Sequence, residues 1–398
     1  MQKRVGNFHE EFSKNPYYRF FQNVHANWLR FTTLLSERIV NQHLRPLTSD
    51  NRDDCFVIDD TLYERAGYKR TELAARVFDH VDMRFRKGFR LLTLGWTDGC
   101  TFLPINFSLL SSSKDANVLG EIREFDKRSL CHKRRAMART KATTVMVELL
   151  GTAMKAGHRA KYVLMDSWFS HPSQILDIKA LGTNVIAMVK RSSKIHYRFE
   201  GQRKNIKAIW AACKKRRGRS KYLLSVPVQI CVPGKEPVDA RIVCVRNRNN
   251  RKDWIALIST DVSLSEEDII RIYGKRWDIE VFFKACKSTL LLIKGYHGLS
   301  YDALTAHIAI VFVRYMLLAV AKRDNEDERT IGELFYLMVS EVADLTYSES
   351  MLMIATAMLD AVQGMLRLTD AQMDELMERF MNNLPEHLRR SLQPRLAA

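Results

Sequence analysis

Hydrophobic residues repeat at two different spacings along this chain, and the change of spacing divides it. Near the N-terminus, apolar side chains recur every three or four positions from Phe20 to Ile39. This is the helical period, so it predicts two or three short helices in a region of residues 1–52. Arg45–Asn51, which carries a proline and several small polar residues, is predicted to be a linker. From Cys55 onward the apolar residues come in short runs that are typical of β-strands.

Alternating strands and helices are predicted between residues 53 and 194. Strands are expected at 56–58, 91–96 and 102–107, a helix over 133–150, a strand over 162–166, a helix over 174–181 and a strand over 184–189. The residues Thr97–Cys100, with their Asp-Gly pair, predict a hairpin turn between the second and third strands. Three strands, helix, strand, helix, strand is the order of a ribonuclease-H-like core, an α/β fold with a mixed sheet flanked by helices.

The last helix of such a core does not follow at once. Residues 195–261 have the pattern of further strands, at 221–230, 240–245 and 254–259, which predicts a β-rich insertion. Closing helices of the core are expected over 262–323, and a helical C-terminal region over 324–398. Within that last region, Thr369–Gln372 matches a capping box and predicts a helix over 373–382.

Charge narrows the class of partner. The 398-residue chain has 46% hydrophobic residues, enough for a sizeable core, and a formal net charge of +18. Such an excess of cations favours a polyanionic partner, with nucleic acid first. The longest apolar run, Ile308–Ala321, is shorter than the ~20 residues that a membrane span needs. We therefore expect a buried helix there, no membrane association and, since the N-terminus lacks an export signal, a cytoplasmic protein.

Cysteine and histidine give no catalytic signal. The seven cysteines are scattered without zinc-site spacing, so they are predicted to be reduced and mostly buried thiols. The eleven histidines are equally dispersed. A histidine beside apolar residues, such as His307, is expected to be structural.

Four residues late in the chain share the spacing of one helix face. Tyr273, Arg276, Glu280 and Lys287 stand at offsets of 0, 3, 7 and 14. At about 100° per residue these offsets fall within an arc of about 60°. One carboxylate among cations and a tyrosine hydroxyl suits a metal ion beside a phosphodiester. The alternative is a solvated helix with ordinary ion pairs.

Two aspartates upstream favour the metal site. Asp59 follows the predicted strand 56–58, and Asp166 follows 162–165. Together with Glu280, they could converge on two Mg²⁺ ions about 3.5–4 Å apart, the arrangement that phosphodiester chemistry uses. Oxygen-only ligands suit Mg²⁺ or Mn²⁺ rather than zinc. Alternatively, either aspartate alone is an ordinary turn former at a strand end.

On these residues the chain resembles bacterial insertion-sequence transposases of the DDE type, in the group with a Tyr-Arg-Glu-Lys signature. The resemblance spans residues 53–320 and rests on Asp59-Asp60-Thr61, Asp166-Ser167-Trp168-Phe169, Tyr273, Arg276, Glu280 and Lys287. It implies catalytic metal ligands at Asp59, Asp166 and Glu280, and DNA-binding roles for Tyr273, Arg276 and Lys287. Asp60, which directly precedes Thr61, remains the alternative first ligand.

The resemblance also implies an activity. It is cut-and-paste DNA transposition: metal-dependent cleavage at the terminal inverted repeats and transfer of the 3′-hydroxyl into target DNA. A homodimer on paired ends of double-stranded DNA, in the bacterial cytoplasm at the nucleoid, is implied as well. Two other functions stay open. One is a nuclease that cuts without strand transfer, and the other is a domesticated, non-catalytic DNA-binding protein.

Two further features gain a role from the resemblance. Trp254 stands where hairpin-forming relatives hold a flipped base, although a core tryptophan on an insertion strand is the alternative. The basic turn Lys214–Arg217 is expected to contact DNA phosphates, and the alternative is a solvated turn.

Overall fold

One compact unit, Phe12–Asp327, contains all of the residues that the computed structural model describes. Those residues are 14–49, 52–79, 82–216, 220–247, 250 and 253–324. The predicted C-terminal helical region lies outside them apart from residue 324, and so does its predicted helix over 373–382. The first part of the predicted N-terminal region lies outside them as well.

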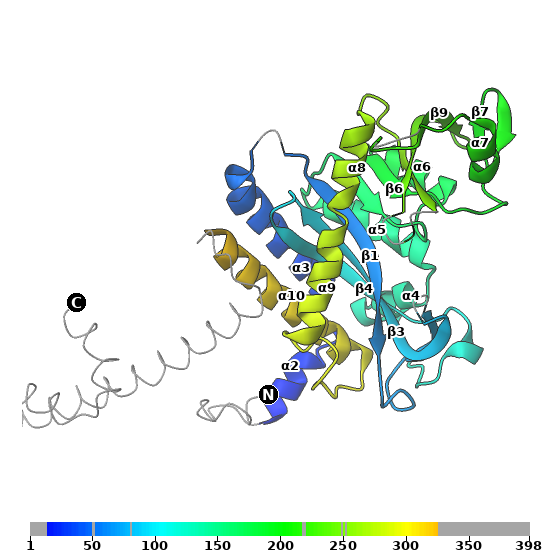
Figure 1. The fold of residues 1–398 in the computed structure, drawn as a ribbon. Helices are drawn as coiled ribbons and strands as arrows, with labels where there is room; N and C mark the ends of the chain where they lie inside the picture. Colours follow the sequence, from blue (N-terminus) through cyan, green and yellow to red (C-terminus); the bar gives the residue numbers. More distant parts are fainter. Residues whose placement is uncertain are drawn as a thin grey trace, which may run out of the picture. The chain divides into compact units, whose positions relative to one another are not determined.

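An eleven-stranded sheet runs through this unit in the order β2-β3-β1-β5-β6-β11-β10-β9-β7-β8, with β4 also paired to β3 (Figure 1). An antiparallel meander of β1 (Cys55–Glu64), β3 (Arg84–Thr97) and β4 (Phe102–Leu110) forms one side. β2 (Ala75–Asp79) pairs with the start of β3. The predicted turn after Thr97 is confirmed, and the Asp98 carboxylate closes it by accepting the N–H of Cys100 and of Thr101, each at 2.8 Å.

The parallel part of the sheet lies on the other side of β1. β5 (Tyr162–Met165) pairs in parallel with β1, and β6 (Asn184–Met188) pairs in parallel with β5. Both strands are short and mostly apolar, as strands covered on two faces are. The predicted α/β class, a ribonuclease-H-like mixed sheet, is confirmed.

The predicted β-rich insertion extends the core sheet. It contains β7 (Tyr197–Phe199), β8 (Gln202–Lys204), β9 (Leu224–Ile230), β10 (Val238–Arg246) and β11 (Trp254–Ser259). β11 pairs antiparallel with β6, so insertion and core share one ladder of hydrogen bonds. The sequence did not predict α7 (Ile206–Ala212), a short helix whose N-terminus is capped by the side chain of Asn205.

Helices cover both faces of the sheet. On β4, the successive residues Asn106 and Phe107 point to opposite faces, and each marks one helical layer. Asn106 donates to the carbonyl of Leu149 in α5 (Ala142–Lys155), whereas Phe107 packs on Phe312 of α10 (Tyr301–Asp324). α6 (Pro172–Ala180) contacts α5 and α9 (Trp277–Ser288) contacts α10, whereas α3 (Trp28–Ile39) contacts β4, α5 and α10. α8 (Glu266–Gly274) lies against β6 and β11.

Two local predictions change in the structure. The N-terminal helices are α2 (Lys14–Phe21) and α3, but the predicted linker begins with helical turns over Val40–Leu44 and Arg45–Leu47, anchored by fully buried Leu44. The single helix expected over 133–150 is two helices, α4 (Leu130–Ala138) and α5, because the chain leaves the helical conformation at Lys141. A short 3-10 turn, Asp115–Asn117, precedes them.

The predicted buried helix at Ile308–Ala321 is the centre of α10. This helix has 24 residues and is long and apolar enough to span a membrane, but 67% of its most apolar stretch is buried inside the protein. Core helices of this kind meet the same criteria of length and composition, so the helix is weak evidence for a membrane span.

Candidate active site

Asp59 lies on the sheet face that α9 covers. It belongs to β1 rather than following it, and its Oδ2 is 3.0 Å from Nη1 of Arg276. Its Oδ1 accepts the N–H of Asp60 at 2.8 Å. The Asp60 side chain points to the opposite face, where Arg90 of β3 holds both of its oxygens. Of the two candidates for the first metal ligand, Asp59 is therefore the one that faces α9.

Asp166 stands beside Asp59 because of the strand register. Ile58 pairs with Met165 in the parallel β1–β5 ladder, so Asp59, within β1, and Asp166, directly after β5, lie side by side. The carboxylate of Asp166 accepts the N–H of Trp168 at 2.8 Å and that of Phe169 at 3.4 Å. These bonds hold the loop after β5 in a tight turn, with the carboxylate at the start of the turn.

The predicted single helix from Tyr273 to Lys287 is in fact two helices. α8 ends at Gly274, α9 begins at Trp277, and Lys275 and Arg276 form the turn between them. Glycine is a poor helix former, which accounts for the end of α8 at Gly274. Both turn residues keep dihedral angles of the right-handed helical region, so the four predicted side chains still approach the same edge of the sheet.

Arg276 joins two of the carboxylates. One guanidinium nitrogen contacts Asp59 and the other contacts Glu280, one helical turn further on. Asp59 and Arg276 have side chains that are only 16% exposed, whereas Glu280 is more open. The structure thus brings Asp59, Arg276 and Glu280 into direct contact, with Asp166 close enough to Arg276 to interact electrostatically.

Burial controls the charge state of this group. It raises the pKa of Asp59 to about 7, and the negative charges of Asp166 and Asp60 act in the same direction against the opposing effect of Arg276. Burial also raises the pKa of Asp166, although the N–H of Trp168 opposes the shift. Carboxylates that repel one another in a partly dry pocket are characteristic of sites that bind a cation.

Tyr273 and Lys287 flank the carboxylates. Burial raises the pKa of the Tyr273 hydroxyl, which makes no hydrogen bond of normal geometry to a described residue but lies near enough to Arg276 to interact electrostatically. Lys287, two turns beyond Glu280, donates to Oγ1 of Thr61 on β1 at 2.5 Å. Burial and the nearby Arg90 lower the pKa of its ammonium group.

The chemical type of the ligands suits a hard divalent cation, although their present positions do not. Asp59, Asp166 and Glu280 offer only carboxylate oxygens, which Mg²⁺ and Mn²⁺ prefer. Within the part of the chain that the structure describes, no three acidic, His or Cys side chains are close enough together to share an ion. The guanidinium of Arg276 instead lies between two of the carboxylates. Binding of an ion therefore requires Arg276 to withdraw and the carboxylates to close.

Trp254 lies outside this cluster, on β11 of the insertion. Its ring stacks on Trp210 of α7 with the centroids 4.4 Å apart and the planes inclined by 13°. Its other neighbour is the guanidinium of Arg191, 5.0 Å from the ring centroid and held by Asp253 at 2.7 and 2.8 Å. A base that stacked on Trp254 would have to displace one of these partners.

Sequence reasoning missed the partner of Trp254 and two contacts beside the carboxylates. Trp210 falls in the helix that was not predicted. Arg90 neutralises Asp60, and the half-exposed Trp168 lies under the ammonium of Lys190 at 4.6 Å. Alternation along β3 gives no hint of the Arg90 pairing, since it depends on the antiparallel register with β1.

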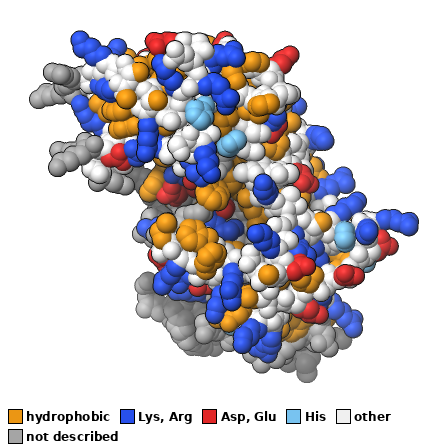
Figure 2. Space-filling view, turned by 90° about the vertical axis from the view of Figure 1, so that its right-hand side faces the viewer, with side chains coloured by type: hydrophobic (Ala, Val, Ile, Leu, Met, Phe, Trp, Pro, Cys, Tyr) orange, Lys and Arg blue, Asp and Glu red, His pale blue; other side chains and the backbone are white. Residues whose placement is uncertain are grey.

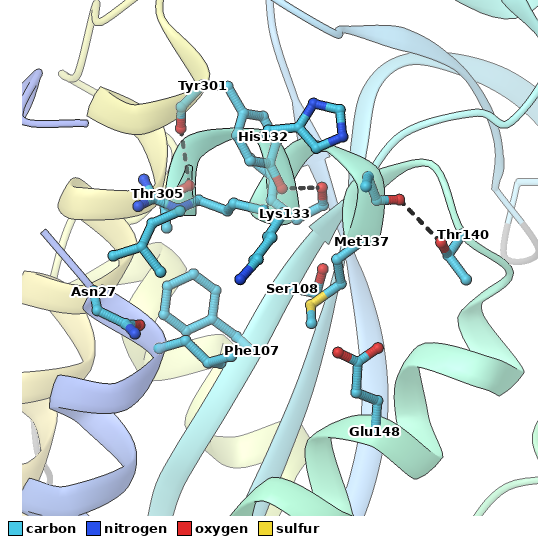
Figure 3. Close-up of a pocket in the computed structure, with 15 residues that line it drawn as sticks. Asn27, Phe107, Ser108, His132, Lys133, Met137, Thr140, Glu148, Tyr301 and Thr305 are labelled. Atoms are coloured by element: carbon cyan, nitrogen blue, oxygen red, sulfur yellow. Dashed lines mark hydrogen bonds between the residues drawn. The ribbon is translucent and has the colours of Figure 1, made fainter. Parts of the chain in front are cut away.

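A cavity between helices and the sheet lies away from this cluster. It has a volume of about 460 Å³ and is formed by α4, α5, α10, β4 and the start of α3. Figure 3 shows Phe107 and Met137 in its wall, with Lys133 above and Glu148 at the α5 side. None of the seven predicted site residues lines it, so the carboxylate cluster remains the candidate for chemistry.

Fold and cluster together define the class: an α/β protein of the ribonuclease-H-like type with carboxylates on the central strands and a packed helix. Residues 1–249, more than half of the chain, match a family model described as DDE superfamily endonuclease, and the chain belongs to that family. The match ends before Tyr273, so it leaves the Tyr-Arg-Glu-Lys signature outside. No curated protein matches the sequence.

Membership in this family gives a coarse function. The protein is a nuclease-type enzyme that acts on DNA, and enzymes of this type typically use divalent metal ions. Figure 2 shows Lys and Arg side chains spread over one face of the protein, among Asp, Glu and apolar side chains.

Proposed function

We propose that this protein is an insertion-sequence transposase of the Tyr-Arg-Glu-Lys group. In this proposal it cleaves double-stranded DNA at the ends of its element and joins the freed 3′-hydroxyl to target DNA. The observation that carries the proposal is the contact of Arg276 with both Asp59 and Glu280, beside Asp166. It supports a single acidic site in which metal ions could replace the guanidinium of Arg276 beside a DNA phosphate.

Asp59, Asp166 and Glu280 would hold two Mg²⁺ ions, or Mn²⁺ in their place. When bound, such ions activate the attacking water or hydroxyl and stabilise the leaving oxygen. With the carboxylates engaged in this way, Arg276 would be free to hold a phosphate oxygen. Lys287, on the next turns of α9, binds the neighbouring phosphate, and Tyr273 orients Arg276.

Cleavage and joining are both in-line displacements at phosphorus, so one pocket can serve both when a 3′-hydroxyl replaces water. We also propose that two copies act on paired ends and that the protein works at the bacterial nucleoid in the cytoplasm. Trp254 would support a flipped base next to the cut, after Arg191 moves away from its ring.

The test replaces single carboxylates. Asp166→Ala or Glu280→Ala should abolish Mg²⁺- and Mn²⁺-dependent cleavage of a duplex that carries the element end, with affinity for that duplex kept within about twofold. Glu236→Ala, which removes an exposed carboxylate between β9 and β10, is the matched control and should cleave normally. Normal cleavage by Asp166→Ala or Glu280→Ala would remove that residue from the site.

Joining needs a separate measurement. Pre-cleaved ends incubated with the wild-type protein and a supercoiled plasmid should give strand-transfer products. If the protein cuts but forms no such products with pre-cleaved ends, it is a nuclease without strand transfer. If it binds DNA but does not cut with either metal, it is a non-catalytic DNA-binding protein.

A further inference from the structure

A β-hairpin extends beyond the end of β1. The β1–β3 ladder ends at the pair Glu64–Gly88, while β2 and β3 continue as a two-stranded ribbon to the pair Asp79–Arg84. This ribbon is at the lower end of β3 in Figure 1. Two-stranded ribbons that protrude from a sheet bury little of their surface, so their exposed side chains are available to a partner.

One face of the hairpin combines apolar and basic side chains. Met83 is 71% exposed and Phe85 is 69% exposed, the highest values among the large hydrophobic residues that the structure describes. Phe85 packs edge-to-face on its cross-strand partner Phe78, with centroids 5.3 Å apart. Lys87, two residues further along β3, stands opposite Arg76 in the β2–β3 ladder, and its ammonium group donates to the hydroxyl of Tyr68 at 3.0 Å. We call Arg76, Phe78, Phe85 and Lys87, which share one face of the ribbon, together with Met83 in the turn that joins β2 to β3, the hairpin face.

The carboxylates of the hairpin are on its other face. Asp79 and Arg84 are cross-strand partners there, and Arg86 contacts Asp82, with Glu64 at 3.7 Å. These groups largely neutralise one another. The described residues of the hairpin face carry two cations and no carboxylate, so this face complements a polyanion.

The hairpin face continues the sheet face of the candidate active site. Thr93 of β3 pairs with Asp59, and successive residues alternate, so Phe85 and Lys87 lie on the same face as Thr93. Eight residues at about 3.3 Å each put Phe85 about 26 Å from Thr93 along the strand. At about 3.4 Å per base pair, this is about eight base pairs of DNA.

We infer that the hairpin face binds duplex DNA about eight base pairs from the scissile phosphate. This inference rests on the proposed function for the position of the cut. Phe85 and Met83 lie against base edges in the minor groove, where apolar wedges of this type insert, while Arg76 and Lys87 contact the flanking phosphates. DNA fits better than an apolar protein surface, because cations lie on the same face as the aromatic rings.

Binding of the full-length protein to a 30-base-pair duplex tests this, with fluorescence anisotropy as the readout. Phe85→Ala with Met83→Ala should weaken binding about tenfold, within the range for losing an aromatic contact with a base, and should leave the salt dependence unchanged. Lys87→Ala should reduce the slope of log affinity against log salt by about 0.9. Arg84→Ala, on the opposite face of the same strand, is the matched control and should change neither quantity.

Three results would overturn the inference. The first is wild-type affinity in the Phe85/Met83 variant, and the second is an equal loss of affinity in Arg84→Ala. The third is self-association of the wild-type protein that the Phe85/Met83 substitutions abolish without any change in DNA binding, since the hairpin face would then bind a second copy. Binding is measured without cleavage, so a protein that binds but never cuts refutes the proposed function and leaves this test intact.

The predicted distance can be tested once the cut is mapped. Two duplexes are compared, each ending about four base pairs from the cut, one shortened on the side of the hairpin and the other on the opposite side. The duplex shortened on the hairpin side should bind the wild-type protein and the Phe85/Met83 variant with equal affinity. Duplexes that extend about twelve base pairs should again separate the two proteins. A difference that persists on both short duplexes would put the contact elsewhere.

Discussion

Asp59 and Asp60 show how strand alternation separates adjacent carboxylates. Asp59 faces α9 and contacts Arg276, whereas Asp60 is held by Arg90 on the other face of the sheet. In the proposed function, metal ions would replace Arg276 at both of the carboxylates that it contacts, Asp59 and Glu280. Asp60 and Arg90 form a buried pair whose loss would leave Arg90 without its carboxylate.

Thermal unfolding with and without Mn²⁺ distinguishes the two aspartates. An ion that binds only the folded protein stabilises it by about 2.7 kcal/mol at about 100 times its Kd. We expect this metal-dependent rise in Tm for the wild type and its absence in Asp59→Asn. Asp60→Asn should have a lower Tm without metal but should retain the rise. The opposite pattern would make Asp60 the ligand.

The rise in Tm should depend on pH. The pKa of Asp59 is raised to about 7, and only its deprotonated form binds a cation, so the effect of Mn²⁺ should grow between pH 6 and 8. Without metal, the contribution of Asp59 to the free energy of unfolding should fall as the pH rises. A raised carboxylate pKa stabilises the fold below the unfolded pKa, and that stability is lost as pH rises through about 7. A metal effect that does not change over this range would exclude Asp59 as the ligand that titrates.

At the scale of elements, α9 aligns the basic residues with β1. Lys287 reaches Thr61 while Asp278, at the other end, accepts a hydrogen bond from Thr97 at 2.7 Å. The helix therefore lies along β1 and β3, with Lys287 and Asp278 held against the sheet. Exposed Lys284 is on the same helix and makes no such contact with β1.

Lys287→Ala tests this alignment. Loss of one charge-assisted hydrogen bond to a phosphate is worth about 1.5–3 kcal/mol, so cleavage should slow by about ten- to a hundred-fold. The metal-dependent rise in Tm should remain. Lys284→Ala, which removes the same charge from the exposed side of α9, should cleave within about twofold of the wild type. Equal losses in the two variants would show that the charge of α9 matters rather than the position of Lys287.

The elements with clear periodicity could be predicted from sequence, and the others could not. Strands β5, β6, β9, β10 and β11 follow from apolar runs bounded by turn residues, and α10 from its long apolar stretch. β2 has only five residues with an exposed arginine inside, and α7 has seven, which is too short for a clear period. The break after Gly274 was hidden, because the residues on both sides keep a common helical pattern.

In the candidate site, too, some features could be predicted from sequence and others could not. Residue type and spacing gave the carboxylates and the cations, because hard-oxygen chemistry restricts the choice. Contacts that depend on register or on a distant element were not accessible, including Arg276 with Asp59 and Trp210 with Trp254. These contacts bring together residues that are far apart in the chain, and local patterns carry no information on them.

The net charge of the whole molecule leads to the last prediction. With +18 on 398 residues, DNA binding should release counterions, and log affinity should fall linearly with log salt by about 0.9 per phosphate contact. Part of this slope should come from the basic turn of the insertion, where Lys214 is exposed and Arg216 lies over Tyr222 at 4.2 Å. Replacing both with alanine should reduce the slope by about 1.8 if each contacts a phosphate. Lys155→Ala, an exposed position on α5 across the sheet from α9, should leave the slope unchanged. Salt-independent binding by the wild type would mean that the positive charge does not contact DNA. An equal reduction of the slope in Lys155→Ala would mean that the charge attracts DNA without binding it at a defined surface.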